Sequence, residues 1–340
     1  MLTPHTVYRS LARNWFLVGL LLALVLGMLL PGAAAVLNPG GRTSTFVVIV
    51  LFLVAGFTLP AEQIKGGLTN FKLHMYVQLF IFGVIPLYFF FTAPFFRGYL
   101  DGYLIYGMYA LAVLPTTIST CVVFTQTTGG NTFGALFNSA VANVAGIFLS
   151  PLLLSLFLAG SGAALPPEEI LAVLLTLTYT MLIPIGLGQA LRLRFTATAR
   201  RVKKRLSEAS SALVLVIVFL TISRTASDPS FLGRLPQLSV PFLFLAVSHV
   251  LLVTLAYFGA RVIGLSREDR ICAMYTAPQK TMAMGIPLLT VYFAARPEVL
   301  ALALFPLLFY HPFQLLTAGV IRGLPAFRNA VSSPTPSMLR

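Results

Sequence analysis

The strongest constraint in this chain is its succession of long apolar runs, which are separated by short connectors that carry most of the Gly, Pro and charge. A helix that crosses the hydrocarbon core of a bilayer needs about 20 predominantly apolar residues. Windows of that length occur ten times, over residues 14–34, 44–60, 73–93, 102–126, 132–158, 168–191, 208–224, 240–264, 269–293 and 298–320. The sequence therefore predicts an all-α polytopic membrane protein with ten transmembrane helices.

Composition excludes the soluble alternatives. Of the 340 residues, 58% are hydrophobic and only 9% are charged, whereas an average soluble domain is roughly 45–50% apolar and about 25% charged. The net charge of +14 would suggest nucleic acid in a soluble protein, but here the expected partner is the lipid bilayer and no nucleic acid is expected. Cys121 and Cys272 have no CxxC spacing, so neither a disulfide framework nor a metal centre is expected.

The distribution of Lys and Arg predicts the orientation, because cytoplasmic connectors of membrane proteins carry an excess of both. With the N-terminus placed in the cytoplasm, seventeen of the 23 bases fall inside. Both termini are therefore expected in the cytoplasm. The basic cluster over residues 192–205 is interpreted as a topology anchor rather than as a site for anionic lipid. The bases left outside are Arg42, Arg97, Arg224, Arg234 and Arg296.

Ten spans divide into two halves of five, over residues 1–160 and 161–325, followed by a cytoplasmic tail over residues 326–340. Because each half has an odd number of spans, the second half must be inverted relative to the first. Inverted repeats are typical of secondary transporters, which bind their solute where interrupted helices of the two halves meet. The sequence therefore predicts interrupted helices at corresponding positions of the two halves.

The fourth and the ninth spans meet that expectation, since each carries a mid-span proline followed at once by polar residues. Proline removes an intrahelical hydrogen bond, and in hydrocarbon the freed carbonyl must face protein or a wet cavity. The alternative is an ordinary kink, which is how Pro86 is interpreted because no polar cluster follows it. The predicted substrate-binding and crossing residues are Pro115, Thr116, Thr117, Ser119, Pro278, Gln279, Lys280 and Thr281.

Lys280 is the one base that the topology does not explain, because it lies about ten residues from either end of its span. A charge at the bilayer centre costs at least ~2.5–3.5 kcal/mol and by default faces a cavity or a partner. No Asp or Glu lies in the core of any span. Three alternatives therefore stay open: an ammonium bound by backbone carbonyls at the break, a neutral amine, and a side chain that reaches the membrane surface.

Neutral oxygen atoms gather near these breaks, and such oxygens suit a monovalent cation at unwound helix ends. No HExxH motif, nucleophile–base pair or P-loop occurs, so neither an enzyme nor an ATP-driven pump is expected, and no cofactor beyond a possible sodium ion. The candidate ion ligands read from the residues are Gln78, Thr120, Asn131, Asn138, Ser139, Asn143 and Gln279.

Two segments carry a family resemblance, LPTTISTCVVFTQTTGGNTFGALFNSAVAN over residues 114–143 and APQKTMAMGIPLL over residues 277–289, with support from VQLFIFGVIP over residues 77–86. The chain resembles the bile acid:sodium symporter family, most closely its sodium/bile acid cotransporter 7 branch and the bacterial homologues of that branch. The resemblance implies a core domain of helices 3–5 and 8–10, a panel domain of helices 1, 2, 6 and 7, and a crossing of helices 4 and 9 at their breaks. It also favours a bacterial inner membrane.

The resemblance further implies two sodium sites behind the crossing. Gln78 and Gln279 match glutamines of the second site. The ligands of the first site are matched by Thr120, Ser139 and Asn138.

Two positions depart from the family pattern. A glutamate that serves both sodium sites is replaced by Tyr275, which is therefore also a candidate at the ion site, and an asparagine is replaced by Lys280. The chain has thus lost an anionic ligand and gained a cation. The Lys280 ammonium could stand in for sodium, could titrate and couple transport to protons, or could neutralise an anionic substrate. A single residual sodium site at Thr120, Ser139 and Asn143 is a further alternative.

The expected function is secondary active transport of a small organic anion or amphipathic solute by alternating access, with sodium coupling altered or replaced by Lys280. The alternative is a non-transporting membrane regulator, because the cotransporter 7 branch is associated with calcium homeostasis. A regulator would not need the polar residues that the two breaks retain.

Overall fold

The computed structural model describes residues 15–58, 70–98, 102–160, 171, 175, 176, 178–227, 233, 235–294 and 296–328, and these residues form helices without a strand. Three shorter apolar helices cover Val18–Leu29, Tyr103–Val113 and Met282–Tyr292. The expected all-α polytopic membrane protein is confirmed. Among the described residues, six helical stretches are long and apolar enough to cross a membrane: Pro39–Thr58, Phe71–Phe96, Thr132–Ala159, Thr196–Thr225, Pro236–Val262 and Val299–Gly323.

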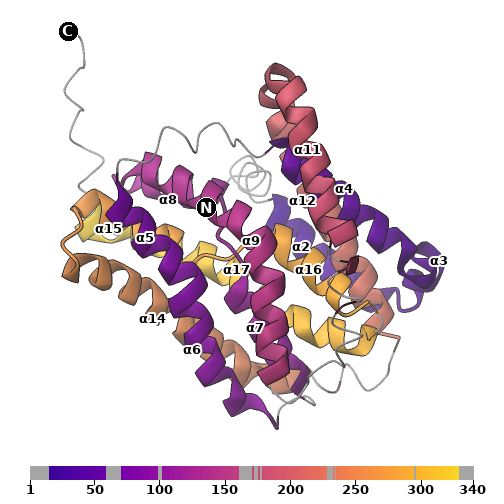
Figure 1. Cartoon of the computed structure of the whole chain (residues 1–340). Helices are drawn as coiled ribbons and strands as arrows, with labels where there is room; N and C mark the ends of the chain where they lie inside the picture. Colours follow the sequence, from indigo (N-terminus) through magenta and orange to yellow (C-terminus); the bar gives the residue numbers. More distant parts are fainter. Residues whose placement is uncertain are drawn as a thin grey trace, which may run out of the picture.

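The helices form two groups (Figure 1). One group packs mainly within itself and comprises α2 (Trp15–Leu29), α4 (Arg42–Thr58), α11 (Ile183–Arg194) and α12 (Thr196–Thr225), with the short helix α3 (Ala33–Leu37) against α12. The other group comprises α5 (Phe71–Leu79), α6 (Ile85–Thr92), α7 (Tyr103–Val113), α8 (Ser119–Thr127), α9 (Thr132–Gly160), α14 (Ser239–Val262), α15 (Arg267–Thr276), α16 (Met282–Tyr292) and α17 (Pro297–Gly323).

Short irregular helices connect or interrupt these elements. A π-helical turn, η3 (Phe80–Val84), joins α5 to α6, and a second one, η6 (Thr178–Leu182), precedes α11. Contacts of α16 and α17 with α12, and of α16 with α4, join the two groups. The remaining short elements are η1 (Pro39–Gly41), η4 (Ala93–Phe96), η7 (Leu235–Leu238) and α18 (Pro325–Arg328).

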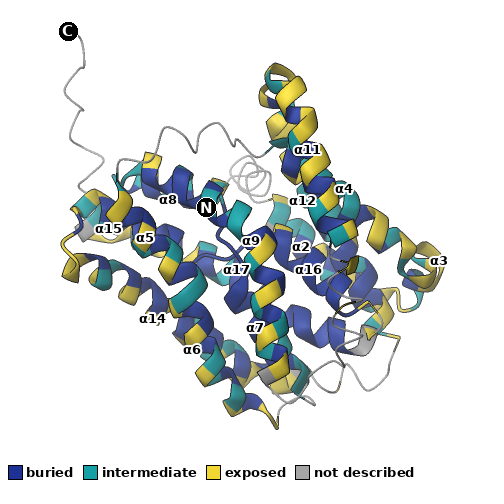
Figure 2. Cartoon of the chain, viewed as in Figure 1, coloured by how far each residue is buried: buried dark blue, intermediate teal, exposed yellow. Residues whose placement is uncertain are grey.

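Large apolar side chains cover much of the outer surface. Leu21 is 64% exposed, Leu243 66% and Phe91 69%. Exposed residues follow the outward faces of the helices, whereas the inward faces are buried (Figure 2). Soluble monomers rarely expose apolar patches of more than a few hundred Å², so a surface of this kind fits the hydrocarbon of a bilayer.

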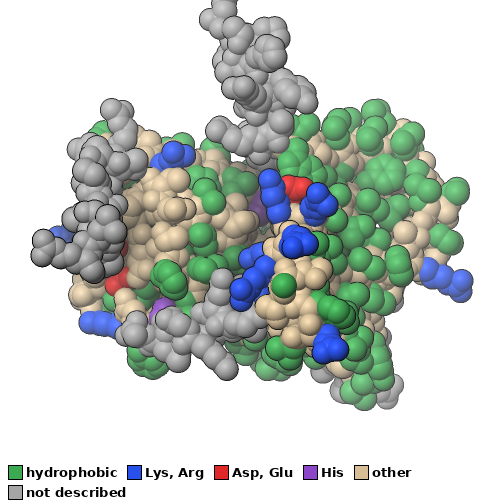
Figure 3. Space-filling model, turned by 90° about the horizontal axis from the view of Figure 1, so that it is seen from above, with side chains coloured by type: hydrophobic (Ala, Val, Ile, Leu, Met, Phe, Trp, Pro, Cys, Tyr) green, Lys and Arg blue, Asp and Glu red, His purple; other side chains and the backbone are tan. Residues whose placement is uncertain are grey.

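The basic cluster differs from its prediction, because it is helical rather than a connector. Helix α11 ends at Arg194 and α12 begins at Thr196. Residues 196–207 contain no Gly or Pro and are rich in Ala, Arg, Lys and Leu, which are strong helix formers. The junction stands at the top of Figure 1, and the view onto this end shows Lys and Arg side chains gathered there (Figure 3). Arg192 is 2% exposed and donates from Nη1 to the Phe57 carbonyl at 3.1 Å.

Several sequence predictions fall outside the described residues. Arg9, Arg13, Lys65 and residues 329–340 are among them, as are residues 168–170, 172–174 and 177 of the predicted span over residues 168–191. The orientation of the termini and the division of the chain into two halves therefore stay predictions.

The close approach of α7 to α17 depends on Gly107. A Cβ atom added at Gly107 would lie 2.1 Å from the Ala303 carbonyl oxygen, which belongs to the backbone and cannot swing aside. We expect Gly107→Ala to lower the free energy of unfolding by about 1–3 kcal/mol, measured as a fall in the thermal midpoint of the purified protein. Gly186→Ala in α11 is the control, because nothing lies within 4 Å of its added Cβ. Equal midpoints for the two variants would contradict this packing.

Candidate functional site

Two helix breaks lie against each other inside the second group of helices. The first break covers residues 114–118 between α7 and α8, and the second covers residues 277–281 between α15 and α16. Leu114 is extended (φ −69°, ψ 147°), as expected for a residue before proline. The Thr281 N–H donates to the Pro115 carbonyl at 3.0 Å. The two predicted breaks are thus joined by a backbone hydrogen bond.

Side chains of neighbouring helices bind the carbonyl groups that the breaks set free. The Asn143 amide donates to the Thr116 carbonyl at 2.8 Å, and the Ser150 hydroxyl donates to the Val113 carbonyl at 2.7 Å. At the second break, the Tyr310 hydroxyl donates to the Pro278 carbonyl at 3.0 Å. Such partners are what allows non-helical backbone to exist at membrane depth.

The side chain of Lys280 ends among three backbone carbonyls. Its Nζ donates to the carbonyls of Leu114 at 2.7 Å, Ala112 at 2.9 Å and Ile81 at 3.4 Å. An ammonium group has three N–H donors, one for each of these acceptors, whereas a neutral amine has fewer. The C-terminal end of α7, which supplies two of the acceptors, also carries the negative end of the helix dipole. The geometry therefore suits a charged Lys280.

The alternative in which Lys280 reaches the membrane surface is wrong. The residue is 0% exposed, and its Nζ contacts three interior carbonyls. No hydrogen bond or ion pair joins Lys280 to an Asp or Glu among the described residues. Its Nζ faces the dipoles of backbone carbonyls rather than a carboxylate.

The Ile81 carbonyl is available because of Pro86, which the sequence suggested was an ordinary kink. In the π-helical turn η3, the N–H of Ile85 binds the carbonyl of Phe80, five residues back. The next N–H in that register would belong to residue 86 and would bind Ile81, but proline has none. Pro86 therefore leaves one carbonyl free to face Lys280.

The backbone of Lys280 is held by Gln314, a residue that the sequence analysis missed. The Lys280 N–H donates to Gln314 Oε1 at 2.8 Å, and Gln314 Nε2 donates to the Lys280 carbonyl at 2.9 Å. His311 Nδ1 lies 2.9 Å from Gln314 Nε2 and 3.3 Å from the Lys280 carbonyl oxygen. The spacing of His311 and Gln314, one helical turn apart in an apolar span, was the signal that could have identified them.

Gln279 connects the second break to α8 and to the polar residues just before it. Its Oε1 accepts from the hydroxyls of Thr117 and Thr120, each at 2.8 Å, and from Cys121 Sγ at 3.3 Å. The hydroxyls of Thr117 and Thr120 also contact each other. These predicted residues therefore form one hydrogen-bonded group across the two breaks.

A second polar group joins α5 to α9. Gln78 Nε2 donates to the backbone carbonyl of Asn138 at 3.0 Å and to its Oδ1 at 3.2 Å. The Asn138 amide in turn contacts His74 Nδ1 at 3.0 Å. Gln78 Oε1 and Ser139 Oγ are buried atoms without a hydrogen-bond partner among the described residues. Both oxygens belong to residues that the sequence predicts as ion ligands.

Two predicted residues, Asn131 and Tyr275, make their hydrogen bonds away from Lys280, and a third, Ser119, is exposed. Asn131 donates to Asp269 Oδ1 at 2.7 Å and accepts the N–H of Gly134 at 2.8 Å, so it caps the start of α9 and ties it to α15. The Tyr275 hydroxyl contacts Thr128 Oγ1 at 3.1 Å. Ser119 is exposed at the first turn of α8.

The sequence profile of the SBF-like CPA transporter family matches residues 14–324. Sodium/bile acid cotransporter 7 of Danio rerio is 29% identical over 326 residues, which cover 94% of this chain and 95% of that protein. The protein of the same name from Xenopus tropicalis is 30% identical over 317 residues (92% of this chain and 91% of that protein). YfeH of Escherichia coli, a candidate symporter, is 26% identical over 281 residues, 82% of each chain.

Proposed function

The chain belongs to the SBF-like CPA transporter family, and from this premise we propose that it moves an organic anion or amphipathic solute by alternating access. The resemblance found in the sequence, to the cotransporter 7 branch, is confirmed. The relatives are named as cotransporters, so the protein is an integral membrane transporter for a small-molecule solute and not an enzyme. The solute's chemistry and the coupling ion are the parts that we infer below.

The proposed architecture has ten spans in two inverted halves, with both termini in the cytoplasm of a bacterial inner membrane. Its panel domain would be α2, α4, α11 and α12, which pack mainly against one another. Its core domain would be the remaining group, within which the broken pairs α7–α8 and α15–α16 touch. Rocking of the core against the panel would expose the crossing of the two breaks to either side in turn.

The proposed mechanism rests on one observation: Lys280 Nζ has three carbonyl partners where the two breaks meet. Carbonyl oxygens at unwound helix ends are the ligands by which secondary transporters hold sodium. We infer that Lys280 is a permanent substitute for such an ion. The crossing would then be held together without external sodium, and its uncompensated positive charge would favour an anionic solute.

Sodium replacement is the test of this proposal. We expect the initial rate of uptake into proteoliposomes to change by less than about two-fold when choline replaces sodium, because Lys280 already fills the cation's place. The assay uses a panel of labelled organic anions that begins with cholate, since the names of the relatives point to bile acids. A ten-fold fall in choline would instead support a residual sodium site at Thr120, Ser139 and Asn143.

Two other outcomes separate the remaining alternatives. A rate that follows an imposed pH gradient in choline would indicate proton coupling. If the wild-type protein carries no member of the panel, the regulator alternative is favoured.

A further inference from the structure

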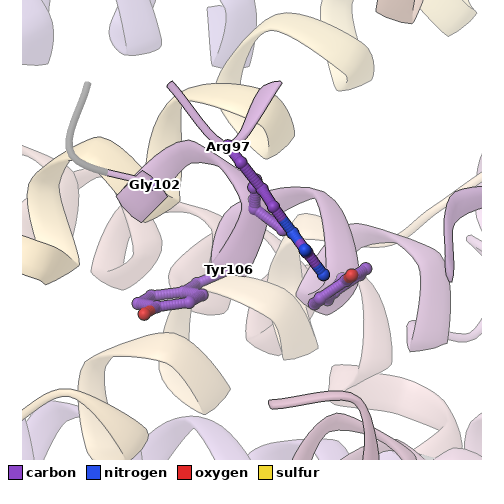
Figure 4. A pocket seen from close by; sticks show the side chains of 5 residues that line it. Arg97, Gly102 and Tyr106 are labelled. Atoms are coloured by element: carbon purple, nitrogen blue, oxygen red, sulfur yellow. The ribbon is translucent and has the colours of Figure 1, made fainter. Parts of the chain in front are cut away.

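A pocket of about 210 Å³ opens at the start of α7, where η4 leads into that helix. This end of the molecule lies opposite the junction of α11 and α12 (Figure 1). The pocket is lined by Arg97, Gly102, Ile105, Tyr106 and Tyr109. Figure 4 shows the Arg97 side chain extending into the pocket, with its guanidinium turned away from the Tyr106 ring and Gly102 at the rim.

The polar groups of this pocket are unused within the described part of the chain. Arg97 has no ion pair or hydrogen bond with a described residue, and the hydroxyls of Tyr106 and Tyr109 have no hydrogen-bond partner there either. Tyr109 is nevertheless only 1% exposed. Buried tyrosine hydroxyls usually find a partner, so the Tyr109 hydroxyl can serve as a donor to a ligand in the pocket.

The donors match an oxyanion. A guanidinium offers a planar fork of N–H groups that binds carboxylate or sulfonate oxygens in pairs, and a phenol hydroxyl such as that of Tyr109 can donate to the same group. Ile105 and the tyrosine rings supply an apolar wall. Sites for drug-sized ligands occupy about 300–1,000 Å³, so this smaller pocket fits an acid group and the carbons next to it.

The pocket lies on the same helix as the carbonyls that hold Lys280. Tyr109 precedes Leu114 by five residues, which is about 7.5 Å of helix at 1.5 Å per residue. Tyr106 stacks on Phe293, which follows α16, with ring centroids 5.9 Å apart. One lining residue of the pocket thus contacts the segment that follows the second broken helix pair. Arg97 is also one of the few bases that the predicted topology leaves outside.

We propose that the Arg97 pocket binds the acid group of an organic anion at the outer end of the core, before the solute reaches the crossing at Lys280. The order of the two steps rests on the proposed function and its orientation, whereas binding to the pocket does not. The probe for this site is benzenesulfonate, which combines an oxyanion with a ring of suitable size.

Calorimetric titration of the full-length protein in detergent tests the proposal. We expect saturable binding of benzenesulfonate, and no binding of benzyl alcohol at the same concentrations. Arg97→Gln should weaken binding about 10- to 100-fold, because charge-assisted hydrogen bonds are lost. Tyr109→Phe, which keeps the ring, should weaken it by roughly three- to ten-fold. Arg42→Gln is the matched control, since Arg42 is exposed at the start of α4 and also lies outside in the predicted topology.

Affinities within two-fold of wild type for both Arg97→Gln and Tyr109→Phe would overturn the proposal, as would the absence of binding to wild type. If Arg97→Gln does not fold, Tyr109→Phe decides alone. Loss of binding in Arg42→Gln to the same extent would assign the effect to general surface charge and overturn it too. None of these results bears on uptake or on Lys280, so the proposed function is judged separately by the sodium replacement.

Discussion

Replacing Lys280 with methionine is expected to lower the thermal midpoint of the purified protein by roughly 4 °C or more, and to stop uptake of any anion that the wild type carries. The substitution removes the donor from three buried carbonyls, and each unsatisfied group costs about 1–3 kcal/mol. At about 2.1 cal/mol/K per residue, the unfolding entropy of 340 residues is about 0.7 kcal/mol/K, so a loss of ~3 kcal/mol shifts the midpoint by about 4 °C. Methionine keeps the length of the side chain, so packing changes little.

The control for this variant is Lys72→Met. Lys72 is exposed in the first turn of α5, and an exposed substitution is expected to stay within about 0.5 kcal/mol. Thermal melts of the two variants in the same detergent give the comparison. If Lys280→Met has the same thermal midpoint as wild type, the three carbonyls find other donors. If the variant also transports at the wild-type rate, Lys280 has no part in the mechanism.

Replacing Gln314 with leucine is expected to have the second largest effect. The Gln314 side chain makes hydrogen bonds with both the N–H and the carbonyl of Lys280. Leucine leaves both buried groups without this partner, at a cost of about 2–6 kcal/mol when each is worth about 1–3 kcal/mol. We further expect the second break to lose its fixed geometry, so uptake should fall even in protein that remains folded at the assay temperature.

Thr317→Val is the matched control for Gln314→Leu. Thr317 lies one turn further along α17, and its hydroxyl donates at 2.9 Å to the Phe313 carbonyl of the same helix. Thermal melting and uptake of the two variants are compared with wild type. If Gln314→Leu behaves like Thr317→Val, the side chain of Gln314 does not hold the break.

The sequence located the two helix breaks because the signals for them act locally. Pro115 and Pro278 cannot continue a hydrogen-bonded helix, and the structure breaks α7–α8 and α15–α16 at these residues. Lys280 was identifiable because a base in the middle of a span must face either a cavity or a binding partner. Neither inference needed to know how the spans are packed.

The partners of the site were not predictable in the same way, since they depend on how each helix is rotated about its axis. Gln314 and the Ile81 carbonyl come from helices far away in the sequence. The side chain of a polar residue such as Gln314 can face any of several neighbouring helices, depending on that rotation. Asn131 shows the converse. An asparagine at the start of a helix can cap its free N–H groups, and Asn131 accepts the N–H of Gly134 in this way rather than joining the residues around Lys280.

The basic cluster shows a further reason for a difference between prediction and structure. Hydropathy marks where a span leaves the membrane, but not where its helix ends. Residues 196–207 are polar and yet strongly helix-forming, so α12 continues through them.

Equilibrium binding of radiolabelled sodium to purified protein decides whether Lys280 takes the place of a cation. The comparison is between wild type and Lys280→Asn, which restores the residue that the family resemblance implies at this position. Wild type is predicted to bind no sodium saturably, because Lys280 Nζ already donates to the three carbonyls at the crossing. Lys280→Asn is predicted to bind sodium or to lose stability that sodium restores. Saturable, stoichiometric binding of sodium to the wild-type protein would contradict the substitution of Lys280 for the ion.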